Sequence, residues 1–376
     1  MMSSRIIGHE PRTLDEIHVP SGLSPIIKTK GPCVILHRSN DPWYKGGIFD
    51  NVISSIEELY SHKKYLFLLS LHDDWCGIKQ IMNYLPYIEF LKKQNYKTFF
   101  YNTEDLTIFK GIIELYPNFV SDVEIYKNKA FESLEATGSY DVKFKTEYYD
   151  DKFNNLYSLY TTILMLFYFK KYNGDVWLDF SEANEEVLKL LFPKETINFK
   201  FFIPISKTDI TSNRENTTKP VFFGSIPIKE NDEEQVELEK RLNIFRRQEI
   251  FTNIDFKHHS HSDPISKTEL KESDYGVSLD LKMNNFREAP DYLRIFDSLN
   301  TGMLPVAEAS KTDNCYNNSI FKFNKNFSTD TKEISKDLNE KLLLLKDNTY
   351  FKTELTRCID SFNDINKTLI KTFSEY

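Results

Sequence analysis

The chain has 376 residues, of which 40% are hydrophobic and 14% aromatic, and its formal net charge is -8 at pH 7. This length favours two domains with a core each, and the acidic balance gives no global attraction to nucleic acid or anionic membranes. No apolar run approaches the ~18 residues of a membrane span. The N-terminal residues lack the apolar core of a signal peptide, and the four scattered cysteines suit reduced thiols. We therefore expect a cytoplasmic protein.

The first half of the sequence predicts a parallel sheet. Residues 1–30 show no sustained periodicity and are expected to form an extended arm. Continuous apolar runs such as YLFLLSL at 65–71 are typical of strands buried on both faces. In chain order we expect strands at 33–36 and 65–71, a helix at 78–94, and strands at 98–101, 176–178 and 199–205. This βαβ rhythm predicts a first Rossmann-like domain over residues 31–206.

The second half repeats that layout. An almost wholly polar stretch at 207–219 is the predicted linker, and residues 220–376 form the second predicted Rossmann-like domain. The expected elements are strands at 221–223, 250–256, 276–279 and 303–306, with helices at 233–247, 290–301 and 332–372. Ligands in such α/β sheets bind at the carboxyl ends of the strands, so two of them predict a central cleft.

The segment from Glu288 to Glu308 (EAPDYLRIFDSLNTGMLPVAE) carries the most specific chemistry. Arg294 and Asp297 are one helical turn apart and are expected to be neighbours. For an arbitrary helix, a solvated ion pair is the simplest interpretation. At the mouth of a cleft, however, an arginine fork suits a diphosphate and a carboxylate suits a ribose diol. The pair therefore predicts a nucleotide-diphosphate site.

This segment resembles the block R-x-x-E-A-x-x-x-G-x-x-P-V of glycosyltransferases of the GT-B type, which have two Rossmann-like domains. Arg294, Asp297, Gly302, Pro305 and Val306 match it in order and spacing, with Asp in place of the usual Glu. The resemblance implies that Arg294 contacts the donor diphosphate and that Asp297 holds the ribose. It implies a nucleotide-diphosphate sugar, most simply a UDP-sugar, as co-substrate, with a metal ion not required or only assisting.

Two further features extend the resemblance over the second half of the chain. Gly224 and Ser225 follow a strand in VFFGS, as in the small-residue loop that lets backbone amides approach donor phosphates. The pattern is nearest to the phage DNA glucosyltransferases, which place an Asn-containing turn before L-R-x-aromatic-acid. Many retaining members carry E-x7-E, whose first Glu would fall on Ala289. Glu288 is one position away, which favours an inverting mechanism.

An inverting transfer needs a general base on the acceptor hydroxyl. Asp179 follows the strand VWL, and Asp74 follows YLFLLSL after His72 and Asp73. We rank Asp179 first and Asp74 second, although an aspartate that caps the next helix is the more common role at each position.

Other candidates carry weaker signals. Gly46 and Gly47 open a loop that contacts donor or acceptor, or form a tight turn. His261 lies in an expected acceptor-facing loop near His258 and His259. Adjacent histidines seldom converge on one ion, so we predict no metal site.

The sequence thus predicts a glycosyltransferase and leaves its acceptor open. One acceptor is double-stranded DNA with hydroxymethylated bases, which places a phage-encoded enzyme in the host cytoplasm. The other is a glycan, in surface polysaccharide or glycoconjugate synthesis. A non-catalytic GT-B binding module is the third hypothesis, and the intact Arg294 and Asp297 argue against it.

Overall fold

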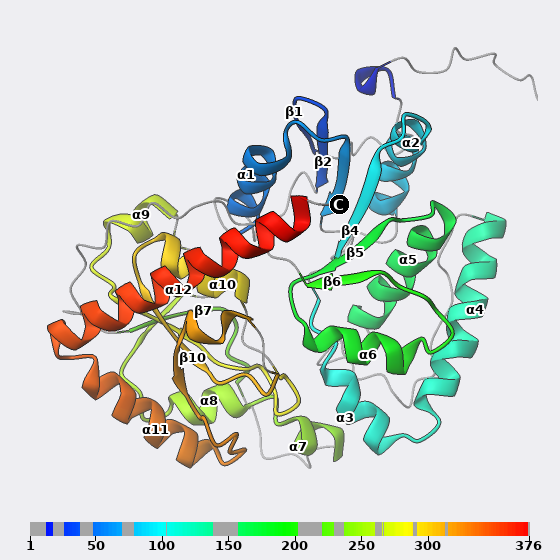
Figure 1. Cartoon of the computed structure of the whole chain (residues 1–376). Helices are drawn as coiled ribbons and strands as arrows, with labels where there is room; N and C mark the ends of the chain where they lie inside the picture. The colour runs from blue at the N-terminus through cyan, green and yellow to red at the C-terminus, as the bar shows by residue number, and fades with distance from the viewer. Residues whose placement is uncertain are drawn as a thin grey trace, which may run out of the picture.

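The structure is a computed structural model (Figure 1). It describes residues 13–17, 26–37, 48–69, 79–102, 104–137, 157–201, 220–228, 237–259, 265, 267–288, 292–312 and 315–374. Within these ranges the chain forms two sheets, of six and five strands, each covered by helices. The predicted α/β fold with two Rossmann-like domains is confirmed at this level.

The first sheet has its strands in chain order, β1–β2–β3–β4–β5–β6. The strands are β1 (Ile26–Lys30), β2 (Cys33–His37), β3 (Tyr65–Leu69), β4 (Lys97–Asn102), β5 (Val176–Asp179) and β6 (Phe199–Phe201). The β1–β2 pair is antiparallel and the other pairs are parallel. All five residues of β3 are buried, as its continuous apolar run predicts, because both faces of the sheet are covered.

The two faces of this sheet belong to different hydrophobic clusters. Tyr65, Phe67 and Leu69 pack on the side of α1 (Ile48–Tyr60). Leu66 and Leu68 face the other helices of the first domain. Those helices are α2 (Lys79–Lys93), α3 (Ile108–Leu115), α4 (Phe119–Thr137), α5 (Tyr157–Lys171) and α6 (Ala183–Leu191). A single 3-10 turn, Leu14–Glu16, precedes the sheet.

The second sheet is parallel throughout, in the order β11–β10–β9–β7–β8. Its strands are β7 (Val221–Phe223), β8 (Lys257–His259), β9 (Val277–Asp280), β10 (Leu304–Glu308) and β11 (Phe321–Phe323). The chain moves from β7 outward to β8 and then returns to β9 on the opposite side of β7. This reversal creates a topological switch point between β7 and β9, the place where doubly wound sheets bind ligands.

Six helices are described in the second half, together with a 3-10 turn. They are α7 (Glu237–Leu242), α8 (Arg246–Phe251), α9 (Lys267–Glu272), α10 (Tyr292–Asn300), α11 (Thr331–Leu344), α12 (Asn348–Ser374) and the turn η4 (Cys315–Asn318). As Figure 1 shows, α12 runs from the second sheet across to the first, where the C-terminus is marked.

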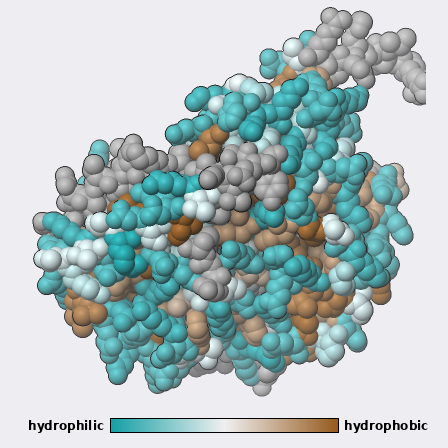
Figure 2. Space-filling view, in the orientation of Figure 1, coloured by the Kyte–Doolittle hydropathy of each residue, from teal (hydrophilic) through white to brown (hydrophobic). Residues whose placement is uncertain are grey.

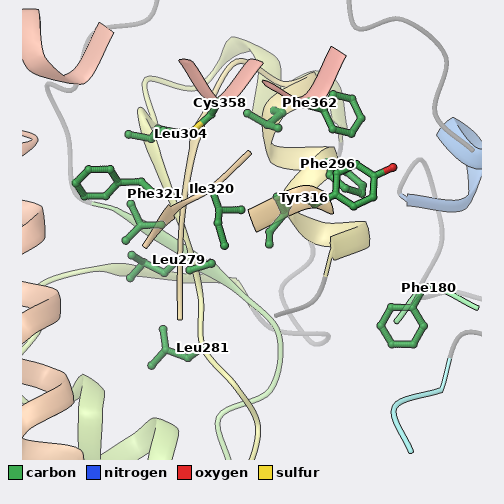
Figure 3. Packing of buried hydrophobic residues seen from close by; sticks show 14 of the residues in the cluster. Phe180, Leu279, Leu281, Phe296, Leu304, Tyr316, Ile320, Phe321, Cys358 and Phe362 are labelled. Carbon is green, nitrogen blue, oxygen red and sulfur yellow. The ribbon is translucent and has the colours of Figure 1, made fainter. Parts of the chain in front are cut away.

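One hydrophobic cluster joins the two halves. The rings of Phe296, Tyr316 and Phe362 lie together, with centroids 4.7 Å and 4.4 Å from that of Phe296 (Figure 3). Tyr316 also meets Phe201 of β6, at 5.6 Å. Phe180, which follows β5, belongs to the same cluster. The second domain and the carboxyl edge of the first sheet therefore share apolar contacts.

Several expected elements differ from the structure. The arm predicted over residues 1–30 ends in β1, which pairs with β2. The strand expected at 250–256 is wrong: Ile250 and Phe251 end helix α8 with their side chains buried, because an apolar pair can serve a helix face as well as a strand. The helices α3 and α4 lie between the expected strands at 98–101 and 176–178, in a less regular stretch to which we assigned no element. The predicted C-terminal helix is broken at 345–347.

The predicted linker at 207–219 lies outside the described residues. None of the helices in the described ranges combines the length and apolar character that a bilayer span requires. In the space-filling view, hydrophilic residues cover most of the visible face, and hydrophobic ones gather around α6 and β6, where Leu190 is 42% exposed (Figure 2).

Candidate functional site

The carboxyl ends of the two sheets face each other. Asp105 follows β4 of the first sheet, and its Oδ2 lies 3.0 Å from Nε of Arg287, which follows β9 of the second. One turn into α3, Lys110 donates to Glu288 Oε1 at 2.7 Å. Glu288 immediately precedes the segment that leads into α10. Loops from both sheet ends are thus joined by ion pairs at the edge where ligands are expected.

Asp179 ends β5 at this edge and is fully buried. Its Oδ2 accepts from Asn102 Nδ2 at 2.8 Å and from Trp177 Nε1 at 3.5 Å. Its Oδ1 accepts from the Ser181 amide at 3.0 Å and from Asn184 Nδ2 at 2.9 Å. Both carboxyl oxygens are therefore occupied by neutral donors of neighbouring elements, an arrangement that holds β4, β5 and α6 together.

Burial raises the pKa of the Asp179 carboxyl from 3.8 to about 7, although the four donors act in the opposite direction. A pKa near neutrality suits a general base. The absence of exposed surface and the complete set of hydrogen bonds suit a structural carboxyl better. Proton transfer from an acceptor would require one of these donors to leave.

The predicted donor loop and Arg294 lie together at the carboxyl end of β7. Arg294 extends from α10 and donates through Nη1 to the carbonyl of Phe223 at 2.7 Å. Gly224 has φ +134, and a Cβ at this position would overlap the Arg294 guanidinium. The sequence separates the loop and the arginine by about 70 residues, and the fold brings them into contact at the β7–β9 switch point.

Two more basic side chains hold the same loop. Arg247 Nη1 donates to the carbonyl of Ser225 at 3.1 Å, and its other nitrogens donate to Leu281 after β9. His258 Nε2 lies 2.7 Å from the carbonyl of Gly224. The three carbonyls from Phe223 to Ser225 are thus turned toward basic groups. The positive charge gathered here suits an anionic ligand.

Other predicted site residues are only partly described. The backbone of Asp297 lies in α10, but its side chain is outside the described residues, as are Asp74, His72, Gly46, Gly47 and His261. Glu288 is described. It is held by Lys110, which also pairs with Glu186 at 2.6 Å, so its carboxylate links the domains.

A buried ionic network at the end of β10 was not predicted from the sequence. Glu308, the last residue of β10, is fully buried and accepts from Arg246 Nη1 at 2.6 Å and Nη2 at 2.8 Å. It also accepts from the Lys282 amide at 2.7 Å and from Asn324 Nδ2 at 3.2 Å. Burial acts to raise the pKa of the Glu308 carboxyl, but Arg246 and Lys282 together lower it to about 2. The sequence feature that indicates this network is a Glu at the end of an otherwise apolar strand (LPVAE).

Comparison with models of known protein families gives no match for this sequence, and no curated protein matches it either. The function must therefore be argued from these residues and their geometry.

Proposed function

We propose that this protein is a glycosyltransferase that moves a sugar from a nucleotide-diphosphate donor to a hydroxyl acceptor. The observation that carries the proposal is the contact between Arg294 and the Phe223–Gly224 loop at the switch point of the second sheet. This contact joins the two parts of the sequence that resemble a GT-B donor site, and the two-sheet architecture supports the same assignment.

In this proposal the diphosphate binds beside the Gly224 loop. The absence of a side chain at Gly224 leaves room for the Arg294 guanidinium to lie against the backbone of the loop. Arg294 supplies a permanent positive charge on a planar fork, which can bind phosphate oxygens and stabilise the departing diphosphate. Asp297, one turn further along α10, is the proposed ribose ligand. A UDP-sugar is the proposed donor.

The base must come from the first domain, and the two candidates now differ. Both carboxyl oxygens of Asp179 accept hydrogen bonds from neighbouring residues, and the residue has no exposed surface. These contacts favour a positioning role, in which Asp179 fixes the loops after β4 and β5. We therefore propose Asp74, ahead of Asp179, as the group that takes the proton in an inverting displacement.

The buried free thiols of Cys33 and Cys358 suit a reducing compartment, which supports a cytoplasmic enzyme. The acceptor is proposed only as a hydroxyl compound, with modified DNA and glycans as the two classes. Binding to DNA would fall steeply with rising salt, because phosphate contacts release counterions. A glycan acceptor would show a much weaker salt dependence.

The test is Arg294→Ala, with UDP affinity measured by calorimetry and transfer measured with a panel of UDP-sugars. Loss of charge-assisted hydrogen bonds worth ~1.5–3 kcal/mol should weaken UDP binding by roughly 10–150-fold and abolish transfer. Arg357→Ala is the matched control, since Arg357 on α12 also pairs with a carboxylate, Glu354, and donates to backbone carbonyls, those of Asn318 and Ile320. If Arg294→Ala binds UDP as tightly as the wild type, the donor site is not at this loop.

A further inference from the structure

A second group of basic residues lies beyond the Arg294 loop, at the carboxyl ends of β9, β10 and β11. A small pocket there is lined by four cationic residues and one carboxylate among its charged groups. The cations are Arg246, Lys282, Arg287 and Lys311, and the carboxylate is Glu308. Of these, Arg287 already has Asp105 as a partner across the domain interface.

Glu308 is a counterion shared by Arg246 and Lys282. Its two oxygens receive four hydrogen bonds, two of them from Arg246. The Lys282 ammonium does not reach it by a hydrogen bond and instead donates to the carbonyl of Ala309 at 2.5 Å. One carboxylate therefore cannot offset the positive charges of Arg246, Lys282 and Lys311 together.

Lys282 is an unusual residue in this position. Its side chain is 5% exposed, and Ala309 is the acceptor that the described residues offer to its three ammonium protons. Its Nζ also lies 5.8 Å from the ring centroid of Phe327, which is 41% exposed. Burial is the largest cause that lowers the pKa of Lys282, and Glu308 opposes it. Arg246, Lys311 and Arg287 add to the lowering, so that the pKa falls from 10.5 to about 8.

A buried ammonium surrounded by like charges is costly unless an anion compensates it. The described part of the pocket offers donors in excess: besides the Lys282 protons, Arg246 Nε is buried without a partner among the described residues. The exposed Lys311 stands at the rim, and Asn284 and Ser328 add polar lining.

We propose that this pocket binds an oxyanion group, a carboxylate or a phosphate, that is separate from the diphosphate bound at Arg294. Its identification as part of a substrate rests on the proposed function: the transferred sugar or its acceptor then carries an acidic group. The anion site itself does not depend on that function.

The pocket and the donor loop lie on the same edge but on different strands. Arg247 contacts Ser225 beyond β7, whereas its neighbour Arg246 contacts Glu308 at the end of β10. Since β9 lies between β7 and β10, and neighbouring strands are ~4.8 Å apart, the two anions would be held ~10 Å from each other. That separation fits two groups of one substrate pair rather than two atoms of one phosphate.

The experiment is thermal unfolding of the full chain with inorganic phosphate at constant ionic strength, with sodium chloride as the balancing salt. Specific binding gives a saturable rise in Tm. Lys282→Met should weaken phosphate binding by about 10-fold or more, and Lys311→Ala, an exposed change that keeps the fold intact, by about 3–10-fold. Lys367→Ala, an exposed lysine on α12, is the control for general salting effects.

Saturating UDP then separates this pocket from the diphosphate site. Phosphate should still bind in the presence of saturating UDP, because UDP occupies the diphosphate site at Arg294 and leaves this pocket open. If UDP-glucuronate displaces phosphate and UDP does not, the acidic group is on the sugar. If neither displaces it, the acidic group is on the acceptor.

The proposal is overturned if phosphate gives no saturable effect, if Lys311→Ala and Lys282→Met both bind it normally, or if UDP alone displaces it. Failure of UDP to bind the wild type would instead overturn the proposed function, while the phosphate titration would still decide the anion site.

Discussion

Asp179 and Glu308 occupy the same place in the two sheets and have opposite electrostatics. Each ends a central parallel strand and is fully buried. Asp179 is surrounded by neutral donors, and burial raises its pKa to about 7. Glu308 faces a guanidinium, and its pKa falls to about 2. Four neutral hydrogen bonds therefore do not offset burial at Asp179, whereas a bidentate arginine, assisted by Lys282, does so at Glu308.

The functional meaning of the two ends differs in the same way. The first sheet ends in a neutral network that is complete within the protein. The second sheet ends in charged groups that lie around Gly224 and Lys282. Their total positive charge exceeds the negative charge of the neighbouring carboxylate, Glu308. An edge that carries unbalanced charge is suited to a charged ligand, which supports our proposal that the donor and the anion bind to the second domain.

We expect the largest loss of stability from removing a charge at the carboxyl end of the second sheet (the charged end, around Arg246 and Glu308). Arg246→Met leaves Glu308 buried without its guanidinium, which should lower the free energy of unfolding by ~3–5 kcal/mol. Chemical denaturation at pH 7 measures this loss. Adding Glu308→Leu removes the orphaned charge and should recover most of the stability. If the single variant is as stable as the wild type, the Arg246–Glu308 pair contributes little to stability. Glu308 would then not depend on a charged partner in the way that distinguishes it from Asp179.

A substitution at the carboxyl end of the first sheet (the neutral end, around Asp179) should reduce stability less, and the reduction should depend on pH. Between about pH 4 and pH 7 the folded state keeps a proton on Asp179 that the unfolded state has released. Its contribution to stability therefore falls as pH rises through this window. Asp179→Asn loses one acceptor, which costs ~1–3 kcal/mol at pH 5, and the difference from the wild type should narrow by pH 8.

Activity distinguishes the two roles of this carboxyl. If Asp179 only positions loops, Asp179→Asn at a temperature where it is folded should keep most of its transfer rate. Asp74→Asn should then lower the chemical rate by roughly 10²–10⁴-fold with unchanged donor affinity. A loss of that size in Asp179→Asn, with Asp74→Asn active, would return the base to Asp179.

A smaller change tests the loop at the charged end. Gly224→Ala places a methyl group where the Arg294 guanidinium lies and forces a non-glycine residue to φ +134. We expect a loss of ~1–3 kcal/mol in stability from the backbone strain and weaker UDP binding because Arg294 must move. Gly174→Ala is the control, since its methyl group would meet Phe169 in the first domain, away from the donor loop. Equal UDP affinity in both variants would contradict the placement of the donor.

The sequence predicted the sheets better than the charged edge. Continuous apolar runs predicted β3 and β5, because both faces of those strands are covered. The spacing in the α10 block predicted Arg294 as a donor ligand, and the small-residue loop in VFFGS separately predicted Gly224. The structure brings these two predicted residues into contact. The partnership of Arg246 with Glu308 spans 62 residues and depends on the order of the strands, which local periodicity does not reveal. Helix α8 was assigned partly to a strand for a different reason, because its last residues, Ile250 and Phe251, form an apolar pair that fits a strand as well as a helix face.

We expect the smallest loss of stability from removing the ion pairs of Lys110, one of which joins the two domains. Lys110 contacts Glu288 and Glu186, and its side chain is 18% exposed, as against 17% for Glu288 and 65% for Glu186. Lys110→Met should cost about 1 kcal/mol, less at high salt because the exposed partner is screened. Lys189→Met, which loses a pair with both partners well exposed, is the control and should cost about half as much.

A double-mutant cycle with Glu288→Gln isolates the cross-domain part of that small effect. Lys110 lies in the first domain and Glu288 precedes the helix that carries Arg294. Their coupling energy therefore measures how much this ion pair stabilises the contact between the two domains. If the pair acts directly, the loss in the double variant should be smaller than the sum of the single losses by about 0.5–1 kcal/mol. Additive losses would mean that each residue stabilises only its own domain. The hydrophobic cluster around Tyr316 and Phe201 would then provide the connection between the two sheets.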